Sequence, residues 1–177
     1  MTSQIHSAPS RESASRRDFV TAVTAVAAAG ATATTVSAQA QTGVSLRHSN
    51  PPGMTQPTAY SHVVEANGPN RLVFVAGQTG VDANGKTAQG FRAQAVQAFE
   101  NIKTALASVG GNMDHIVRLT TYMTDLEQNA DAYREVRASF FPNKSALPAS
   151  TLLQITRLAN SSYLIEVDAT AILPPRA

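Results

Sequence analysis

Two carboxylates near the C-terminal end of the chain are the residues best suited to chemistry. Glu166 and Asp168 stand two residues apart in a run that alternates apolar and polar side chains over residues 163–172. Alternation of this kind is typical of a β-strand, and it places both carboxylates on the same face. Because a carboxylate can accept a proton from water, this face is a candidate for general-base chemistry.

A second run rich in β-forming residues precedes the carboxylates and begins with two hydroxyl groups, Ser150 and Thr151. A polar segment over residues 157–162 separates the two runs, so we expect them to form a C-terminal β-hairpin. The hydroxyls would then line a pocket near the carboxylates, or they would only start the strand. Asp168 either orients a water molecule or is an ordinary solvated carboxylate, whereas Glu166 is interpreted as a structural residue nearer the rim.

Residues 1–40 have the order of a twin-arginine export signal. Arg16 and Arg17 precede a weakly apolar, alanine-rich stretch that ends in an Ala-x-Ala cleavage pattern at residues 38–40. We therefore expect recognition by the twin-arginine export machinery, cleavage after Ala40 and a periplasmic location. The apolar run is too short and weak for a stable membrane span, which needs about 20 strongly apolar residues. The chain has no cysteine, so packing alone must hold an exported domain together.

The rest of the chain predicts strands and helices in the order ββ, α, β, α, ββ. The expected elements are an extended arm or loop at 41–58, a hairpin of strands 60–65 and 72–76, a helix at 91–109, a strand at 115–124, a second helix ending before Pro142, and the C-terminal hairpin. Both helices are apolar on one face only, so they can pack on one side of a single mixed sheet of about six strands. The other sheet face then needs cover, and self-association is the natural source of it.

Composition argues against several classes of function. The formal net charge is only +2, and no basic tract lies beyond the signal, so nucleic-acid binding is not expected. His62 and His115 are isolated, with no second ligand at metal spacing, and we expect no metal and no other cofactor. The sequence also lacks a phosphate-binding loop, a dinucleotide fingerprint and a Ser-His-Asp signature.

An ordered set of short segments carries a family resemblance. The segments are Ala59-Tyr60-Ser61-His62-Val63-Val64, Leu72-Val73-Phe74-Val75-Ala76-Gly77-Gln78, Phe99-Glu100-Asn101-Ile102, Ile116-Val117-Arg118-Leu119-Thr120-Thr121-Tyr122, Pro148-Ala149-Ser150-Thr151 and Ile165-Glu166-Val167-Asp168-Ala169-Thr170-Ala171. Together they resemble the RidA family, also called YjgF or endoribonuclease L-PSP. The resemblance implies that residues 59–177 form a chorismate-mutase-like α+β domain, which assembles as a homotrimeric barrel with small-molecule pockets at its subunit interfaces.

The resemblance also implies a reaction and roles for particular residues. Active members hydrolyse imines or enamines from amino-acid metabolism to a keto acid and ammonia. In them an arginine after Pro-Ala binds the substrate carboxylate, a glutamate on the last strand positions water, and a tyrosine helps to close the pocket. Tyr60 matches the tyrosine, and Asp168 stands where the glutamate usually stands. Ser150 stands where the arginine is expected, and a serine has neither the charge nor the two-pronged geometry of a guanidinium.

Three further residues are expected near the pocket. Gly77 and Gln78 would shape the loop that borders it. Arg137, or Arg134 in the same region, would restore a positive charge near the pocket. The alternative is an arginine that is solvated or paired with a neighbouring acid, either Asp131 or Glu135.

We therefore expect a trimer that binds small imine, enamine or carbonyl metabolites, with Asp168 as the candidate catalytic residue. Hydrolysis of these compounds to a carbonyl compound and ammonia is one possibility. A non-catalytic binding or structural trimer on the same scaffold is the other. Ribonuclease activity has little support, because there is no histidine pair for RNA cleavage and no basic groove.

Overall fold

The computed structural model describes residues 43–176, which contain two sheets and two α-helices. In chain order the elements are β1 (Ser45–Ser49), β2 (Val63–Asn67), β3 (Arg71–Thr79), α1 (Phe91–Ser108), a short 3₁₀ helix (Met113–His115), β4 (Ile116–Met123), α2 (Leu126–Phe140), β5 (Ala149–Gln154) and β6 (Ile165–Leu173). The predicted export signal at residues 1–40 lies outside the described residues. Within residues 43–176, neither helix has the length and apolar character needed to cross a membrane.

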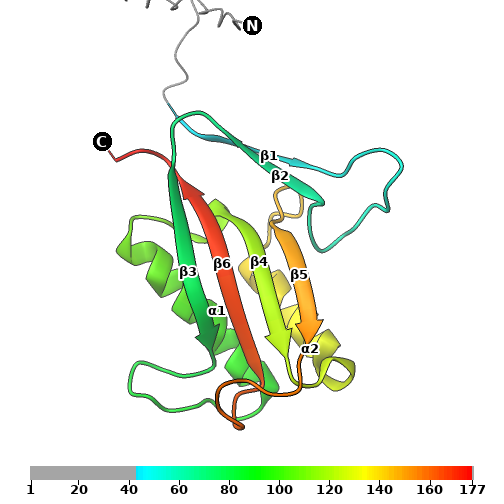
Figure 1. Ribbon diagram of the computed structural model, residues 1–177, viewed down its shortest axis with the longest axis vertical. Helices are drawn as coiled ribbons and strands as arrows, with labels where there is room; N and C mark the ends of the chain where they lie inside the picture. Colours follow the sequence, from blue (N-terminus) through cyan, green and yellow to red (C-terminus); the bar gives the residue numbers. More distant parts are fainter. Residues whose placement is uncertain (1–42, 177) are drawn as a thin grey trace, which may run out of the picture. The chain divides into compact units, whose positions relative to one another are not determined.

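Four strands form one mixed sheet in the order β3-β6-β4-β5. β6 pairs antiparallel with β3 and β4, and β5 pairs parallel with β4. Both helices lie behind this sheet in Figure 1, which leaves its front face without a helix. The predicted α+β class, with two helices on one side of a mixed sheet, is confirmed.

The hydrophobic core lies between α1, α2 and the sheet. Ile165, Val167 and Ala169 of β6 are buried in one cluster with Phe99 and Ile102 of α1. The side chains that alternate with these β6 residues are only half-buried. The predicted alternation along this strand is therefore present, and it sends both carboxylates to the face opposite the helices.

The predicted hairpins do not form. β4 lies between β5 and β6, and the connection over residues 155–164 buries Leu158, so it packs as a long loop and not as a tight turn. β2 pairs with β1 and not with β3, because the turn at residues 68–70 redirects the chain to the edge of the main sheet. The expected single sheet of about six strands is thus a sheet of four and a separate ribbon of two. β1 itself lies in the segment predicted as an arm or loop.

The predicted bounds of the first helix and the predicted end of the second before Pro142 are confirmed to within one or two residues. Gly110 adopts a left-handed φ of 78° just after α1, and Gly111 N–H donates to the Leu106 carbonyl at 2.8 Å, as in a glycine-capped C-terminus. Asp125 caps α2, because its side chain accepts from Gln128 N–H at 2.9 Å.

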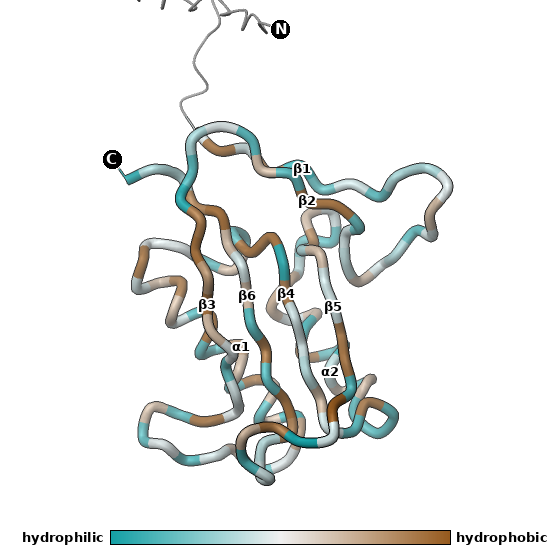
Figure 2. Tube along the Cα trace, viewed as in Figure 1, coloured by the Kyte–Doolittle hydropathy of each residue, from teal (hydrophilic) through white to brown (hydrophobic). Residues whose placement is uncertain are grey.

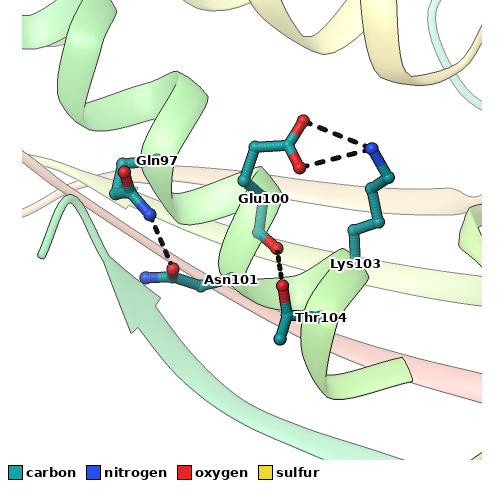
Figure 3. Close-up of polar contacts among 5 residues, drawn as sticks. All are labelled: Gln97, Glu100, Asn101, Lys103 and Thr104. Carbon is teal, nitrogen blue, oxygen red and sulfur yellow. Dashed lines mark hydrogen bonds and ion pairs between the residues drawn. The ribbon is translucent and has the colours of Figure 1, made fainter. Parts of the chain in front are cut away.

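Polar side chains of α1 fix the chain that leaves β3. Asn101 Nδ2 donates to the carbonyl oxygens of Thr79 and Val81, at 3.1 Å and 2.9 Å. Gln97 donates to the Asn101 side-chain oxygen at 2.8 Å, and this contact orients the amide (Figure 3). The helix therefore holds the start of the loop that follows β3, at the end of the strand that carries Gly77 and Gln78.

The buried Gln94 side chain attaches α1 to the residues before β6. Its Nε2 donates to Ser162 O at 2.9 Å, and its Oε1 accepts from Leu164 N–H at 2.8 Å. Gly80 packs directly on this residue: a Cβ at Gly80 would lie 2.4 Å from Gln94 Cα, which belongs to the backbone. The position thus has no space for even a methyl group.

We expect Gly80→Ala to lower the free energy of unfolding by about 1–3 kcal/mol, because the added methyl overpacks against the helix backbone. Urea denaturation of the purified protein measures the change. Gly43→Ala is the matched control, since nothing lies within 4 Å of a Cβ at that position. Its effect should stay below about 0.5 kcal/mol. Equal stabilities of the two variants would contradict the close approach of Gly80 to α1.

Candidate functional site

A cavity of about 500 Å³ opens between α2, β5 and the segment before β2. α2 contributes Tyr133 and Arg137, which are four residues apart and so share one helix face. β5 contributes Ser150 and Leu152, which alternate and so point to the same side. Tyr60 lines the cavity from the segment before β2.

The guanidinium of Arg137 is the most unusual group in this cavity. The residue is only 6% exposed, and its Cζ lies 5.3 Å from the centroid of the Phe141 ring. Nη1 donates to the carbonyl oxygen of Ala59. Within the part of the chain that the structure describes, the buried Nε and Nη2 have no hydrogen-bond partner. One edge of a buried cation is therefore left unpaired.

The acids expected as alternative partners of Arg137 are engaged elsewhere. Asp131 pairs with Arg134 at 2.5 Å, and Glu135 pairs with Arg92 at 2.5 Å. The interpretation of Arg137 as a solvated or acid-paired surface arginine is therefore wrong. Its position on the inner face of α2 explains this, because the neighbouring acids point outward.

Tyr133 links α2 to the sheet beside Arg137. Its hydroxyl lies 2.8 Å from Thr121 Oγ1 on β4. Burial raises the pKa of Tyr133, and the hydrogen bond with Thr121 opposes this rise, as do smaller contributions from Arg137 and Ser150. Burial also lowers the pKa of Arg137, with Tyr133 acting in the opposite direction. Tyr133, Arg137 and Ser150 therefore lie close together in the cavity.

The strand register places Asp168 away from this cavity. Asp168 is opposite Thr120 of β4, which in turn is opposite Thr151 of β5, so the three side chains form a row on the open sheet face. Neighbouring strands are spaced by just under 5 Å, so Asp168 and Thr151 are about 10 Å apart. Arg118 Nη2 donates to Thr151 Oγ1 at 3.3 Å on this face. Ser150 and Thr151 therefore point to opposite sides of the sheet.

Gly77 and Gln78 also belong to the region of the open face. Gly77 falls where the pairing of β3 with β6 shifts register, between Val75 and Gln78. A Cβ at Gly77 would lie 1.9 Å from Glu166 Oε1, so the missing side chain leaves space for the Glu166 carboxylate. Gln78 Nε2 donates locally to the Ala76 carbonyl at 3.0 Å.

The predicted site residues thus divide into two groups within one chain. Tyr60, Arg137 and Ser150 lie together in the cavity on the helix side. The second group comprises Asp168, Thr151, Gly77 and Gln78, none of which lines the cavity. Over residues 43–176, no three His, Asp or Glu side chains gather as metal ligands.

Comparison with known proteins assigns the chain to a family. The model of the family described as endoribonuclease L-PSP matches residues 53–173. The chain belongs to this family. It is the family that is also called RidA or YjgF, as the sequence segments predicted.

Individual relatives agree with the assignment to the RidA family. A RutC family protein of Aquifex aeolicus is 32% identical over 112 residues, which cover 62% of this chain and 86% of the relative. A 2-iminobutanoate/2-iminopropanoate deaminase of Salmonella typhimurium is 29% identical over 117 residues, with coverage of 66% and 91%. The crystal structure of YyfB from Yersinia pestis, a Rid family protein of unknown function, superposes with a TM-score of 0.67 at 32% identity and covers 72% and 98% of the two chains.

The sequence did not identify every residue of this cavity. Tyr133 was not among the predicted site residues, although its spacing of four from Arg137 was available as a signal. Lys144 and Leu152 also line the cavity. The Ala59 carbonyl could not have been found, because a backbone contact across the fold leaves no mark in the residue types.

Proposed function

We propose that this RidA-family protein binds small imine, enamine or carbonyl metabolites in the cavity between α2 and β5 and hydrolyses the C=N bond. The supporting observation is the cavity itself, which combines the apolar wall of Leu152 with the polar groups of Tyr60, Ser150 and Arg137. Small-molecule sites have this composition, an apolar lining with a few convergent polar groups. The Salmonella relative is a 2-iminobutanoate/2-iminopropanoate deaminase, which is in keeping with such a ligand.

The proposed reaction needs a group that accepts a proton from water. Asp168 is the candidate: as water adds to the imine carbon, its carboxylate takes one proton from the water and passes it to the imine nitrogen. The resulting carbinolamine then expels ammonia as its hydroxyl proton moves to the leaving nitrogen and the C=O bond forms. The balance is one imine and one water consumed for one carbonyl compound and one ammonia. An enamine reaches the same path by tautomerising to the imine.

We propose a homotrimer, because Asp168 and the cavity of one chain lie on opposite faces of the sheet. A neighbouring copy can bring its open face to this cavity and supply the carboxylate. The open face has the surface for such contact: Leu72 and Phe74, on the same side as Asp168 by their register with β6, are 53% and 75% exposed. Exposed apolar side chains of this size favour a protein interface.

Ammonia release tests the proposed hydrolysis. With freshly generated 2-aminoacrylate or a cyclic imine, we expect release faster than in buffer, measured by a coupled assay. Asp168→Asn should lower kcat by about 100-fold or more, because the amide cannot accept the proton. Asp114→Asn, at an exposed carboxylate outside the cavity, is the control and should retain the parental rate.

A parental rate equal to that of buffer would support the second candidate, a non-catalytic binding trimer. The observation that favours this candidate is Ser150, which stands where active members of the family have an arginine.

Light scattering on residues 41–177 tests the trimer. We expect the mass of three chains for the parent and dissociation for Phe74→Asp, because a buried unpaired carboxylate is unfavourable at an interface. Val96→Asp is a matched control on the outer side of α1, where Val96 is 41% exposed. A monomeric parent, or dissociation of the control alone, would contradict the proposed interface.

We also propose that residues 1–40 direct export by the twin-arginine route, on the strength of Arg16 and Arg17 before the alanine-rich stretch. Replacing both with lysine should trap the precursor in the cytoplasm of a bacterial host, as seen by fractionation and immunoblotting. Arg11→Lys, outside the pair, should leave delivery unchanged. Periplasmic delivery that survives the double replacement would rule out this route.

A further inference from the structure

We propose that Arg137 of α2 binds the carboxylate of an anionic ligand through its Nε–Nη2 edge, in place of the β5 arginine that this chain lacks. The inference rests on the proposed function of the same cavity. It adds the chemical class of the ligand, a carboxylate with a small apolar body, and the residue that determines this preference.

The geometry of the guanidinium carries the proposal. Nη1 is fixed by the Ala59 carbonyl, and the Phe141 ring lies against the group. These contacts leave Nε and Nη2, which are buried and unpaired among the described residues. The Nε–Nη2 edge presents two parallel N–H groups, and this pair matches the two oxygens of a carboxylate.

The energetics of burial explain why such an edge points to a ligand. A buried charge without a full set of partners is unfavourable, and native proteins pair nearly all buried polar groups. Arg137 keeps its proton at neutral pH, because a guanidinium does not lose it in proteins. An anion that enters the cavity would relieve this unfavourable state, so the chain is prepared to bind one.

The rest of the cavity favours the same class of ligand. Lys144 and Arg134, which is paired with Asp131, line it together with Arg137, and no carboxylate lines it among the residues that the structure describes. Leu152 and Ala138 add apolar surface. A small organic acid satisfies both conditions, whereas inorganic phosphate would leave the apolar wall uncovered.

Repulsion between like charges explains why this chain has a serine at position 150 of β5 when it has an arginine at position 137 of α2. Ser150 and Arg137 line the same cavity, together with Tyr133. A second guanidinium at position 150 would stand beside the first and repel it. A serine at position 150 is uncharged, so it does not repel the Arg137 guanidinium that enters the cavity from α2.

Titration calorimetry with butyrate tests the proposal. We expect parental binding, no comparable binding of the neutral butyramide, and a loss of butyrate affinity on the order of 100-fold in Arg137→Met. Arg137→Gln, which keeps a donor for the Ala59 carbonyl, should show the same loss. If one of the two variants does not fold, the other still tests the proposal. Arg92→Met removes an exposed arginine outside the cavity and should bind like the parent. A separate titration with inorganic phosphate shows whether the site binds any oxyanion.

Placing an arginine on β5 tests the role of Arg137 more directly than its removal alone. Ser150→Arg alone should lower the thermal midpoint and add no affinity for butyrate, because the two cations repel. Combined with Arg137→Met, the same substitution should recover part of the lost affinity. A merely structural Arg137 would not show this recovery.

Several outcomes would overturn the proposal: parental butyrate affinity in both Arg137 variants, no butyrate binding by the parent, equal binding of butyramide, or tighter binding of phosphate. These outcomes are distinct from failure of the proposed reaction. A parent that binds butyrate through Arg137 but releases no ammonia refutes hydrolysis alone. A parent that hydrolyses imines but ignores butyrate refutes the role of Arg137 alone.

Discussion

The placement of β6 between β3 and β4 is the constraint on which the rest of the fold depends. Because β6 is paired on both sides, its register decides which residues enter the core and which face outward. Val167 and Ala169 go to the helices, whereas Glu166 and Asp168 go to the open face. A slip of one residue would exchange the two sets and bury both carboxylates. Because the core must bury the apolar residues of β6, it also determines that Glu166 and Asp168 lie on the open face.

The sheet separates the positively charged groups of the cavity, on its helix side, from the carboxylates on its open side. The helix side holds a cationic cavity lined by the buried Arg137 and Tyr133 and by Ser150. The open side holds the carboxylates and the row of threonines. Assembly is thus the natural way to combine an acid from one copy with a cation from another.

Much of the fold was predictable, because it depends on local patterns. Helical spacing, the caps at Gly110 and Asp125, and the alternation along β6 all depend on neighbouring residues. Strand partners were not predictable, since sequence proximity suggested hairpins and the sheet instead places β4 between β5 and β6. The same limit applied to the cavity. The burial of Arg137 depends on the Ala59 carbonyl, a contact between residues 78 positions apart.

The outer edge of β5 has a further consequence. This strand ends the sheet order, and Leu152 and Leu153 are 38% and 40% exposed on it. Figure 2 shows this apolar stretch at the lower end of β5. An unpaired edge with apolar side chains is a template on which another chain can add a strand, which is the usual start of aggregation. Free chains at high concentration would therefore remain soluble only if another chain or a neighbouring copy quickly covered β5, and crowding during synthesis would favour aggregation at this edge.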